Sequence, residues 1–130
     1  MALPITDADL SATAMRLFFR LAEAWQLVEE QQRWLLGDPD SDEYEDWRVG
    51  SVARLSPPVL ERISYLIGIY QALHTLFPVA AQADSWIRRP SSNLAFEGRS
   101  ALDVMCTEGV EGLALVRGYL GAQLGDEVAQ

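Results

Sequence analysis

The chain has 130 residues with 19 acidic and 10 basic side chains, which give a formal net charge of −9. A chain of this length forms one domain, or two small helical subdomains with a shared core, and it needs no metal or disulfide for stability. The single Cys106 excludes an internal disulfide, and the sequence shows neither a membrane-length apolar run nor a signal-like basic start. We therefore expect a soluble, cytoplasmic protein without a membrane association.

The charge also restricts the class of partner. Every one of the ten basic residues is an arginine, and acidic residues outnumber them almost two to one. Nucleic-acid binding draws its affinity from cations that neutralise phosphates, so this composition disfavours it. A basic protein surface is the better electrostatic match.

The first predicted helix spans residues 7–25. Thr6 is expected to cap it, and Asp9 lies in its first turn, where a negative charge complements the helix dipole. Its apolar residues recur at helical spacing and form the expected core face: Leu10, Ala14, Leu17, Phe18, Leu21 and Trp25.

A shorter helix is predicted over residues 29–36, with Gly37 as its stop and Trp34, Leu35 and Leu36 as its buried end. The stretch 38–46 then carries six carboxylates and no base, where a helix-turn-helix protein would place its recognition helix. A calcium loop is disfavoured because its sixth and twelfth positions lack Gly and Glu. We interpret the acidic run as the solvated face of a degenerate DNA-binding unit; a metal loop or an anion-mimicking surface is the alternative.

A long helix is predicted from Ser56-Pro57, a cap followed by Pro at the first helical position, to Pro78. Its wide apolar stripe predicts a central helix buried on more than one side: Val59, Leu60, Ile63, Leu66, Ile67, Tyr70, Leu73 and Phe77. His74 lies within the stripe and has no second His to join it. We interpret it as a packed core or interface residue rather than a base or metal ligand.

The C-terminal part begins with a short helical piece that carries Trp86, followed by a loop. Ser100 is a predicted N-cap with Asp103 at the capping-box spacing, and Gly109 is a predicted break between two helices. The last helix, residues 112–124, has a face of large residues for the core, Leu113, Val116, Leu120 and Leu124. It also has a small-residue face, Ala114, Gly118, Gly121, Ala122 and Gly125, for which close backbone approach and a weak terminal helix are both open interpretations.

The sequence shows no pattern of residues that would support catalysis. Cys106 follows Val104 and Met105, and we interpret it as a small buried apolar residue rather than a nucleophile. Ser-His-Asp order, a Gly-rich phosphate loop and Cys/His metal spacing are all missing. We therefore expect no catalytic, cofactor or metal residues.

A diffuse motif carries a family resemblance: Trp86, Pro90, Asn93, the run from Phe96 to Asp103, Gly109, Val116, Tyr119 and Leu120. It resembles the toxin-binding domain of the MbcA/ParS/Xre antitoxins, whose members neutralise RES-domain toxins that act on NAD. The upstream half also resembles this family, whose members often carry a helix-turn-helix-like domain there. Together the two halves cover about residues 10–125.

The resemblance implies an all-α fold. Residues 1–77 would form a helix-turn-helix-like unit, and a long helix would join it to a small toxin-binding domain at residues 78–130. It implies a type II antitoxin whose last helix and tail block substrate entry to the toxin. The residues that the resemblance assigns to toxin binding are Trp86, Arg88, Arg89, Asn93, Arg117, Tyr119, Gln123 and Leu124. For Trp86, plain core packing is the alternative.

Two other functions stay open at this stage. Family members often regulate their own operon as DNA-binding dimers, which would draw on Arg48 and Arg54 here, although the acidic run opposes it. A homodimer within a larger complex with the toxin is the expected assembly. The last possibility is an interaction module whose partner is unrelated to toxins.

Overall fold

The computed structural model describes residues 7–90 and 96–128, and these form helices and no strand. The helices are α1 (Asp7–Ala24), α2 (Glu29–Leu35), α3 (Ser41–Arg48), α4 (Pro57–Leu76), α5 (Ala80–Ser85), the 3₁₀ turn η1 (Trp86–Arg88), α6 (Ala101–Glu108) and α7 (Val110–Val128). This confirms the predicted all-α class. Thr6 and Asn93 lie outside the described residues.

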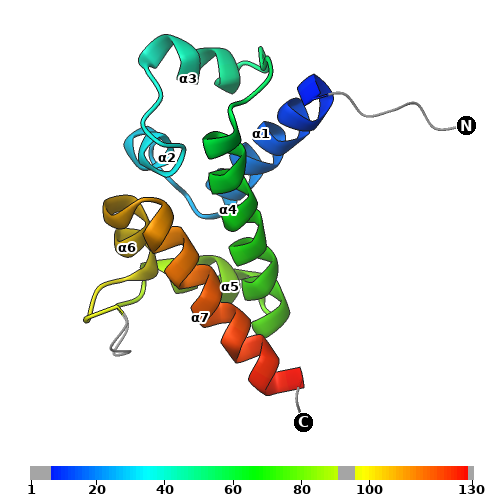
Figure 1. Cartoon of the computed structure of the whole chain (residues 1–130). Helices are drawn as coiled ribbons and strands as arrows, with labels where there is room; N and C mark the ends of the chain where they lie inside the picture. Colours follow the sequence, from blue (N-terminus) through cyan, green and yellow to red (C-terminus); the bar gives the residue numbers. More distant parts are fainter. Residues whose placement is uncertain (1–6, 91–95, 129–130) are drawn as a thin grey trace, which may run out of the picture.

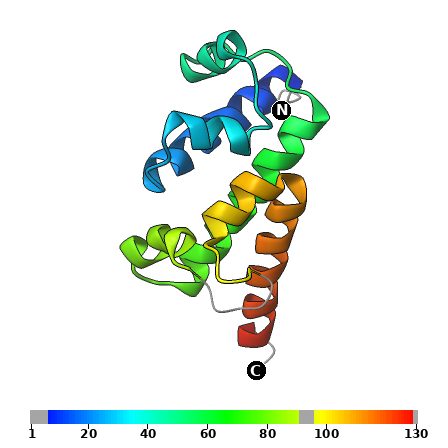
Figure 2. The same ribbon diagram turned by 90° about the vertical axis from the view of Figure 1, so that its left-hand side faces the viewer.

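The long helix α4 holds the molecule together. It packs against α1 on one side and against α5 and α7 on the other, as the two views in Figures 1 and 2 show. Ile63, Leu66, Ile69 and Leu73 are fully buried along it, which confirms the predicted central helix. Ser56 stands at the N-cap position as predicted, but its side chain makes no capping hydrogen bond.

The first helix has the predicted span but not the predicted core face. Phe18, Leu21 and Trp25 are buried, whereas Leu10 is 52% exposed and Leu17 is 40% exposed. The expectation that these two leucines are buried is wrong, because both line an open groove beside α4 and are not covered by it. Helical spacing locates an apolar stripe without showing how much of it a neighbour covers.

The α2–α3 segment separates buried aromatics from exposed acids. Leu35 and Leu36 are buried as predicted, but Trp34 is 44% exposed, so its predicted burial is wrong. All six carboxylates of residues 38–46 are exposed, while Tyr44 and Trp47 point into the core. The acidic run is therefore a solvated surface over a packed helix, and Asp40 caps that helix by accepting a hydrogen bond from the Glu43 amide at 2.8 Å.

In the C-terminal part, two predicted caps are confirmed. Ser100 Oγ accepts a hydrogen bond from the Asp103 amide at 3.1 Å at the start of α6. Gly109 ends α6 with a φ of 65°, a backbone angle that glycine adopts without strain. The last helix begins two residues before the predicted start and runs to Val128, four residues beyond the predicted end. Its free end lies at the opposite end of the molecule from α3 (Figures 1 and 2).

Among residues 7–90 and 96–128, no helix combines the length and the apolar character needed to cross a bilayer.

Candidate functional site

Three aromatic side chains from separate elements meet on one side of α7. Trp86 and Tyr119 stack with ring centroids 6.1 Å apart and an interplanar angle of 17°. Phe96 meets both rings edge to face, with centroids 6.4 Å from Trp86 and 5.2 Å from Tyr119. Phe96 is fully buried, whereas the other two rings are partly exposed. We call these three residues the aromatic cluster.

A surface hollow of about 340 Å³ lies at the aromatic cluster. Phe77, Pro90 and Ala101 complete its apolar lining, and Arg89 supplies its only charged side chain among the described lining residues. Arg89 is exposed, and its Nη2 donates a long hydrogen bond, of 3.4 Å, to Ser85 Oγ. The arrangement offers a partner flat, rigid rings next to a cation, which is the chemistry of an interface anchor.

The position of Tyr119 depends on a close contact between α6 and α7. At Gly112 an added Cβ would lie 2.5 Å from the Val104 carbonyl oxygen, so only glycine allows the two backbones to come this near. Leu113, Val116 and Leu120 are buried along α7, as the sequence predicts. The close backbone approach that the small-residue face suggested therefore occurs at Gly112, which the sequence analysis did not single out.

The small-residue face itself has no backbone neighbour within the described chain. A Cβ added at Gly118 or Gly125 would meet nothing within 4 Å, and at Gly121 it would meet only Arg117 Nη1. These positions lie on the outer side of α7.

Arg88, although adjacent to Arg89, faces a different region. Its Nη2 donates hydrogen bonds to the Trp25 carbonyl and, at 2.9 Å, to the Gln26 carbonyl. Gln26 has a φ of 54°, where α1 has ended and its last carbonyls lack helical partners. Arg88 thus ties η1 to the end of α1, a structural contact that sequence spacing did not reveal.

The other predicted residues are spread along α7. Arg117 and Tyr119 stand about 200° apart around the helix, so they flank opposite sides of its buried stripe. Arg117 lies across α4, where a Cβ added to Gly68 would be 2.6 Å from its Nε. Gln123 is exposed and Leu124 is half-buried against the core. The structure therefore brings Trp86, Arg89 and Tyr119 together and leaves Arg88 and Arg117 elsewhere.

His74 has a partner that the sequence analysis missed. Its Nε2 lies 2.7 Å from Asp84 Oδ1, and its ring packs against that of Tyr70 with centroids 4.2 Å apart and an interplanar angle of 31°. Because Asp84 is on α5 and His74 on α4, the pair fastens these two helices. The interpretation of His74 as a packed residue agrees with this placement, and a carboxylate ten residues downstream was the available signal.

Cys106 is half-buried against the core. Burial, with a smaller effect of the Asp103 carboxylate, raises the pKa of its thiol to about 11. A thiol with this pKa stays protonated near neutral pH, so it lacks the thiolate that a nucleophile needs. Within the described chain, no group of three or more His, Cys, Asp or Glu side chains is placed to hold a metal ion.

The predicted DNA-binding arginines both lie among carboxylates. Arg48 Nε donates to Glu45 Oε2 at 2.9 Å, and this hydrogen bond lowers the pKa of Glu45 and raises that of Arg48. Arg54 lines a separate hollow together with Asp42, Glu43 and Asp46. Exposed acids on α3 would face the phosphates of a DNA groove, which opposes binding.

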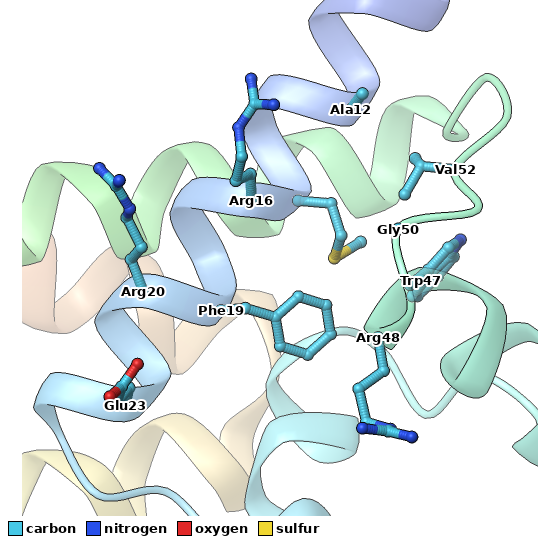
Figure 3. A pocket seen from close by; sticks show the side chains of 10 residues that line it. Ala12, Arg16, Phe19, Arg20, Glu23, Trp47, Arg48, Gly50 and Val52 are labelled. Atoms are coloured by element: carbon cyan, nitrogen blue, oxygen red, sulfur yellow. The ribbon is translucent and has the colours of Figure 1, made fainter.

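A groove between α1 and α3 is lined by several arginines, but their guanidinium groups do not point to one place. Arg16, Arg20 and Arg48 line it around Phe19 and Trp47. Figure 3 shows the Arg16 and Arg48 side chains extending in opposite directions from its two walls, with Phe19 between them. The guanidinium groups therefore do not converge on one anion.

Comparison with known proteins places these elements in a family. The model of the antitoxin Xre/MbcA/ParS C-terminal toxin-binding domain matches residues 72–125, which include η1, α6 and all but the last turn of α7. The chain is 38% identical over 122 residues to an uncharacterized protein of Sinorhizobium fredii, y4oB, and the alignment covers 94% of this chain and 92% of that protein. No solved structure is significantly similar to the chain.

Proposed function

Because the chain belongs to the family of the Xre/MbcA/ParS antitoxins, we propose that it is a type II antitoxin that binds a RES-domain toxin and blocks the toxin's action on NAD. The aromatic cluster is the observation that supports this proposal most directly. It lies inside the toxin-binding domain that the family model matches, and its partly exposed rings are anchored by the buried Phe96. Rigid aromatic side chains lose little entropy on binding and dominate many interfaces.

Arg89 is the charged residue that we assign to the toxin contact. It is exposed, it borders the hollow at the aromatic cluster and its bond to Ser85 Oγ is long, so we propose that the guanidinium binds a carboxylate on the toxin. The net charge of −9 of the whole chain would attract a basic toxin surface over a longer range.

The C-terminal end of α7 is the part that we propose covers the toxin's NAD pocket. This helix continues to Val128, away from the α1–α3 end of the molecule (Figure 1). Gln123 is exposed on it, and the residues that follow include the acids Asp126 and Glu127. An acidic C-terminal sequence suits a pocket built for a phosphate-bearing cofactor, where its charges would take the place of the cofactor's anions.

The test is co-expression with a RES-domain toxin encoded beside this gene, followed by purification of the complex and an assay of NAD consumption. We expect a stable complex that consumes no NAD and that releases an active toxin when the two chains are separated by denaturation. Arg89→Glu should weaken inhibition because it reverses the charge at the hollow. Arg20→Glu, an equally exposed arginine on α1, is the matched control and should inhibit like the wild type.

Trp86→Ala gives a second readout, with Trp34→Ala, a partly exposed tryptophan on α2, as its control. Full inhibition by both the Arg89→Glu and Trp86→Ala proteins would reject the assignment of this surface. No complex with any RES-domain toxin would reject the proposed toxin class. Removal of residues 112–130 without loss of neutralisation would reject the blocking role of α7.

The DNA-binding alternative draws no support from α3. Its exposed side carries carboxylates, and Arg48 is paired with Glu45. We expect no operator binding by the chain alone at physiological salt, and a salt-sensitive footprint upstream of its gene would contradict this.

A further inference from the structure

The residues that we assign to the toxin contact depend on a very short helical stretch. α5 has six residues and continues into the three residues of η1, with Ser85 and Trp86 both in helical conformation at the junction. Trp86 lies in this stretch and Arg89 directly follows it. We call residues 80–88 the α5–η1 segment. A helix shorter than about 12 residues is marginal by itself in water, so the rest of the fold must hold the segment in place.

The apolar contacts of the α5–η1 segment form a single line. Ala83 and Ile87 are fully buried, and every other residue of the segment is partly or largely exposed. Because the two residues are four apart, they lie one above the other on one side of the helix. Apolar burial is favourable but not directional, so one line of contact holds the segment on the core without fixing its rotation. The rotation depends on the polar contacts.

Two polar side chains, also four residues apart, bond the segment to α4 and to the end of α1. Asp84 Oδ1 lies 2.7 Å from His74 Nε2 on α4, and because an ionised carboxylate only accepts, His74 donates this bond. Arg88 Nη2 donates to the carbonyl of Trp25 and, at 2.9 Å, to that of Gln26. Asp84 and Arg88 line one hollow beside the end of α1, which places them on the same side of the segment. Hydrogen bonds are directional, so the two contacts resist rotation.

The contacts around His74 form a closed network. The His74 ring packs against Tyr70 with centroids 4.2 Å apart, and the Tyr70 ring lies 6.2 Å from that of Trp25. The carbonyl of Trp25 accepts the bond from Arg88, which is four residues beyond Asp84. The network therefore joins α1, α4 and the α5–η1 segment, and a rotation of the segment would break its contact with α1 or with α4.

Trp86 faces away from the two bonded side chains. It is two residues from Asp84 and two from Arg88, which turns it by roughly 200° around the helix from each of them. On that side its ring stacks on Tyr119 with centroids 6.1 Å apart, and Arg89 lines the same hollow. A rotation of the α5–η1 segment would therefore move the Trp86 ring off Tyr119 and turn Arg89 with it.

We infer that His74 and Asp84 are positioning residues of the proposed toxin surface: their bond fixes the rotation of the α5–η1 segment and, with it, the direction of Trp86 and Arg89. Neither His74 nor Asp84 lines the hollow at the aromatic cluster, so both act through the segment. The inference rests on the proposed function for its effect on toxin binding, whereas the direction of Trp86 is measurable in the free chain.

The pair is better suited to orientation than to overall stability. The side chains of His74 and Asp84 are 28% and 21% exposed, and solvent-accessible pairs contribute little to the free energy of unfolding. The side chains of a binding site, by contrast, must be held within about 0.5 Å of their productive geometry. Loss of the pair should therefore affect toxin binding more than folding.

The first test is nuclear magnetic resonance of the free chain. His74→Leu removes the donor, so we expect the indole resonance of Trp86 to shift and its nuclear Overhauser effects to the Tyr119 ring to weaken. His74→Gln keeps an N–H donor and is the matched control, which should retain the wild-type Trp86 signals. The indole of Trp34, on α2, is the internal reference and should not move.

The second test is a titration of the same proteins with a purified RES-domain toxin. We expect the dissociation constant to rise about tenfold for His74→Leu, since displaced anchors lose the contacts that dominate an interface. The melting temperature should fall by no more than about 5 °C, and His74→Gln should bind like the wild type. Asp84→Ala and the double variant should lose as much affinity as His74→Leu, because each change breaks the same bond.

The inference is overturned if a folded His74→Leu protein matches the wild type in its Trp86 signals and toxin affinity, or if His74→Leu and His74→Gln lose equally. A displaced Trp86 with unchanged toxin affinity would also overturn it. Asp84→Ala leaves α4 untouched and gives the same readouts if His74→Leu does not fold. If the wild type binds no RES-domain toxin, the proposed function fails, and the spectra of the free chain alone decide whether the pair positions Trp86.

Discussion

The two flanks of α7 differ in whether their apolar side chains are buried or exposed. On the Tyr119 flank, the chain closes its own aromatic cluster around Phe96, which is fully buried. On the Arg117 flank, a groove between α1 and α4 is lined by Leu10 and Leu17, which are 52% and 40% exposed. The first flank therefore holds the side chains of the proposed toxin surface in place, and the second leaves apolar side chains exposed to solvent.

The glycines at the two flanks show the same contrast. Gly112 faces the Val104 carbonyl oxygen, which is backbone, whereas Gly68 faces the side chain of Arg117. A backbone atom cannot move without shifting a helix, while a guanidinium can swing away. We therefore expect a substitution on the Tyr119 flank to destabilise the protein more than a similar substitution on the Arg117 flank.

The largest expected effect is at the centre of the aromatic cluster. Phe96→Ala should lower the free energy of unfolding by about 3–5 kcal/mol, because it removes a fully buried ring and leaves a cavity. Leu17→Ala on the other flank should change it by no more than about 0.5 kcal/mol at low protein concentration. Urea unfolding followed by circular dichroism measures both, and equal losses would contradict the contrast between the flanks.

The two glycines provide the next comparison. Gly112→Ala should destabilise by about 1–3 kcal/mol, because the new methyl group overlaps the Val104 carbonyl. Gly68→Ala should stay within about 1 kcal/mol of the wild type, since the helix propensity gained by alanine offsets the displacement of Arg117. Thermal unfolding of the two variants decides this, and a Gly68→Ala protein as unstable as Gly112→Ala would show that Arg117 is held rigidly.

Variants of the neighbouring Arg88 and Arg89 compare a contact within the protein with a proposed contact to the toxin. Arg88→Ala should destabilise by about 1 kcal/mol, because the carbonyls of Trp25 and Gln26 lose their donor. Arg89→Ala should leave stability within about 0.5 kcal/mol of the wild type and weaken only toxin binding. Denaturant unfolding beside a toxin-binding titration distinguishes them, and a reversed pattern would exchange their roles.

The smallest expected effect is a shift in the titration of Cys106, which tests how firmly α6 stays packed against the core. Because burial raises the pKa of Cys106, folding stabilises the neutral thiol. This stabilisation is complete below the unfolded-state pKa of about 8.5 and is lost as pH rises through about 11. Thiolate absorbance near 240 nm should titrate close to pH 11 in the folded protein and near 8.5 in urea. A folded-state midpoint near 8.5 would mean that the thiol is freely accessible.

Local signals predicted most of the helices. The spacing of apolar residues, the Ser100 cap and the Gly109 break all act within a few residues, so helix positions were readable to within a few residues. The wrong predictions concern residues whose burial depends on helices that are distant in the sequence. Leu10, Leu17 and Trp34 were expected to be buried, yet no described element covers them fully.

The candidate site was predictable in part for the same reason. Trp86, Arg89 and Tyr119 belonged to the expected set and meet at one hollow. The bond from Arg88 to the end of α1 spans more than sixty residues along the chain, and the His74–Asp84 pair joins two helices. Such contacts produce no periodic pattern in the sequence, so the spacing of residue types does not predict them.

The sequence by itself determined the all-α class, the central helix and the resemblance to the antitoxin family, because these depend on local propensity and on a motif in one segment. Only the tertiary structure decided that Tyr119 and Arg117 lie on opposite flanks of α7, that Arg88 bonds to the end of α1, and that Leu10 and Leu17 stay exposed. The reason is that burial and side-chain pairing depend on how far each neighbouring helix extends over a surface, which is set by packing in three dimensions.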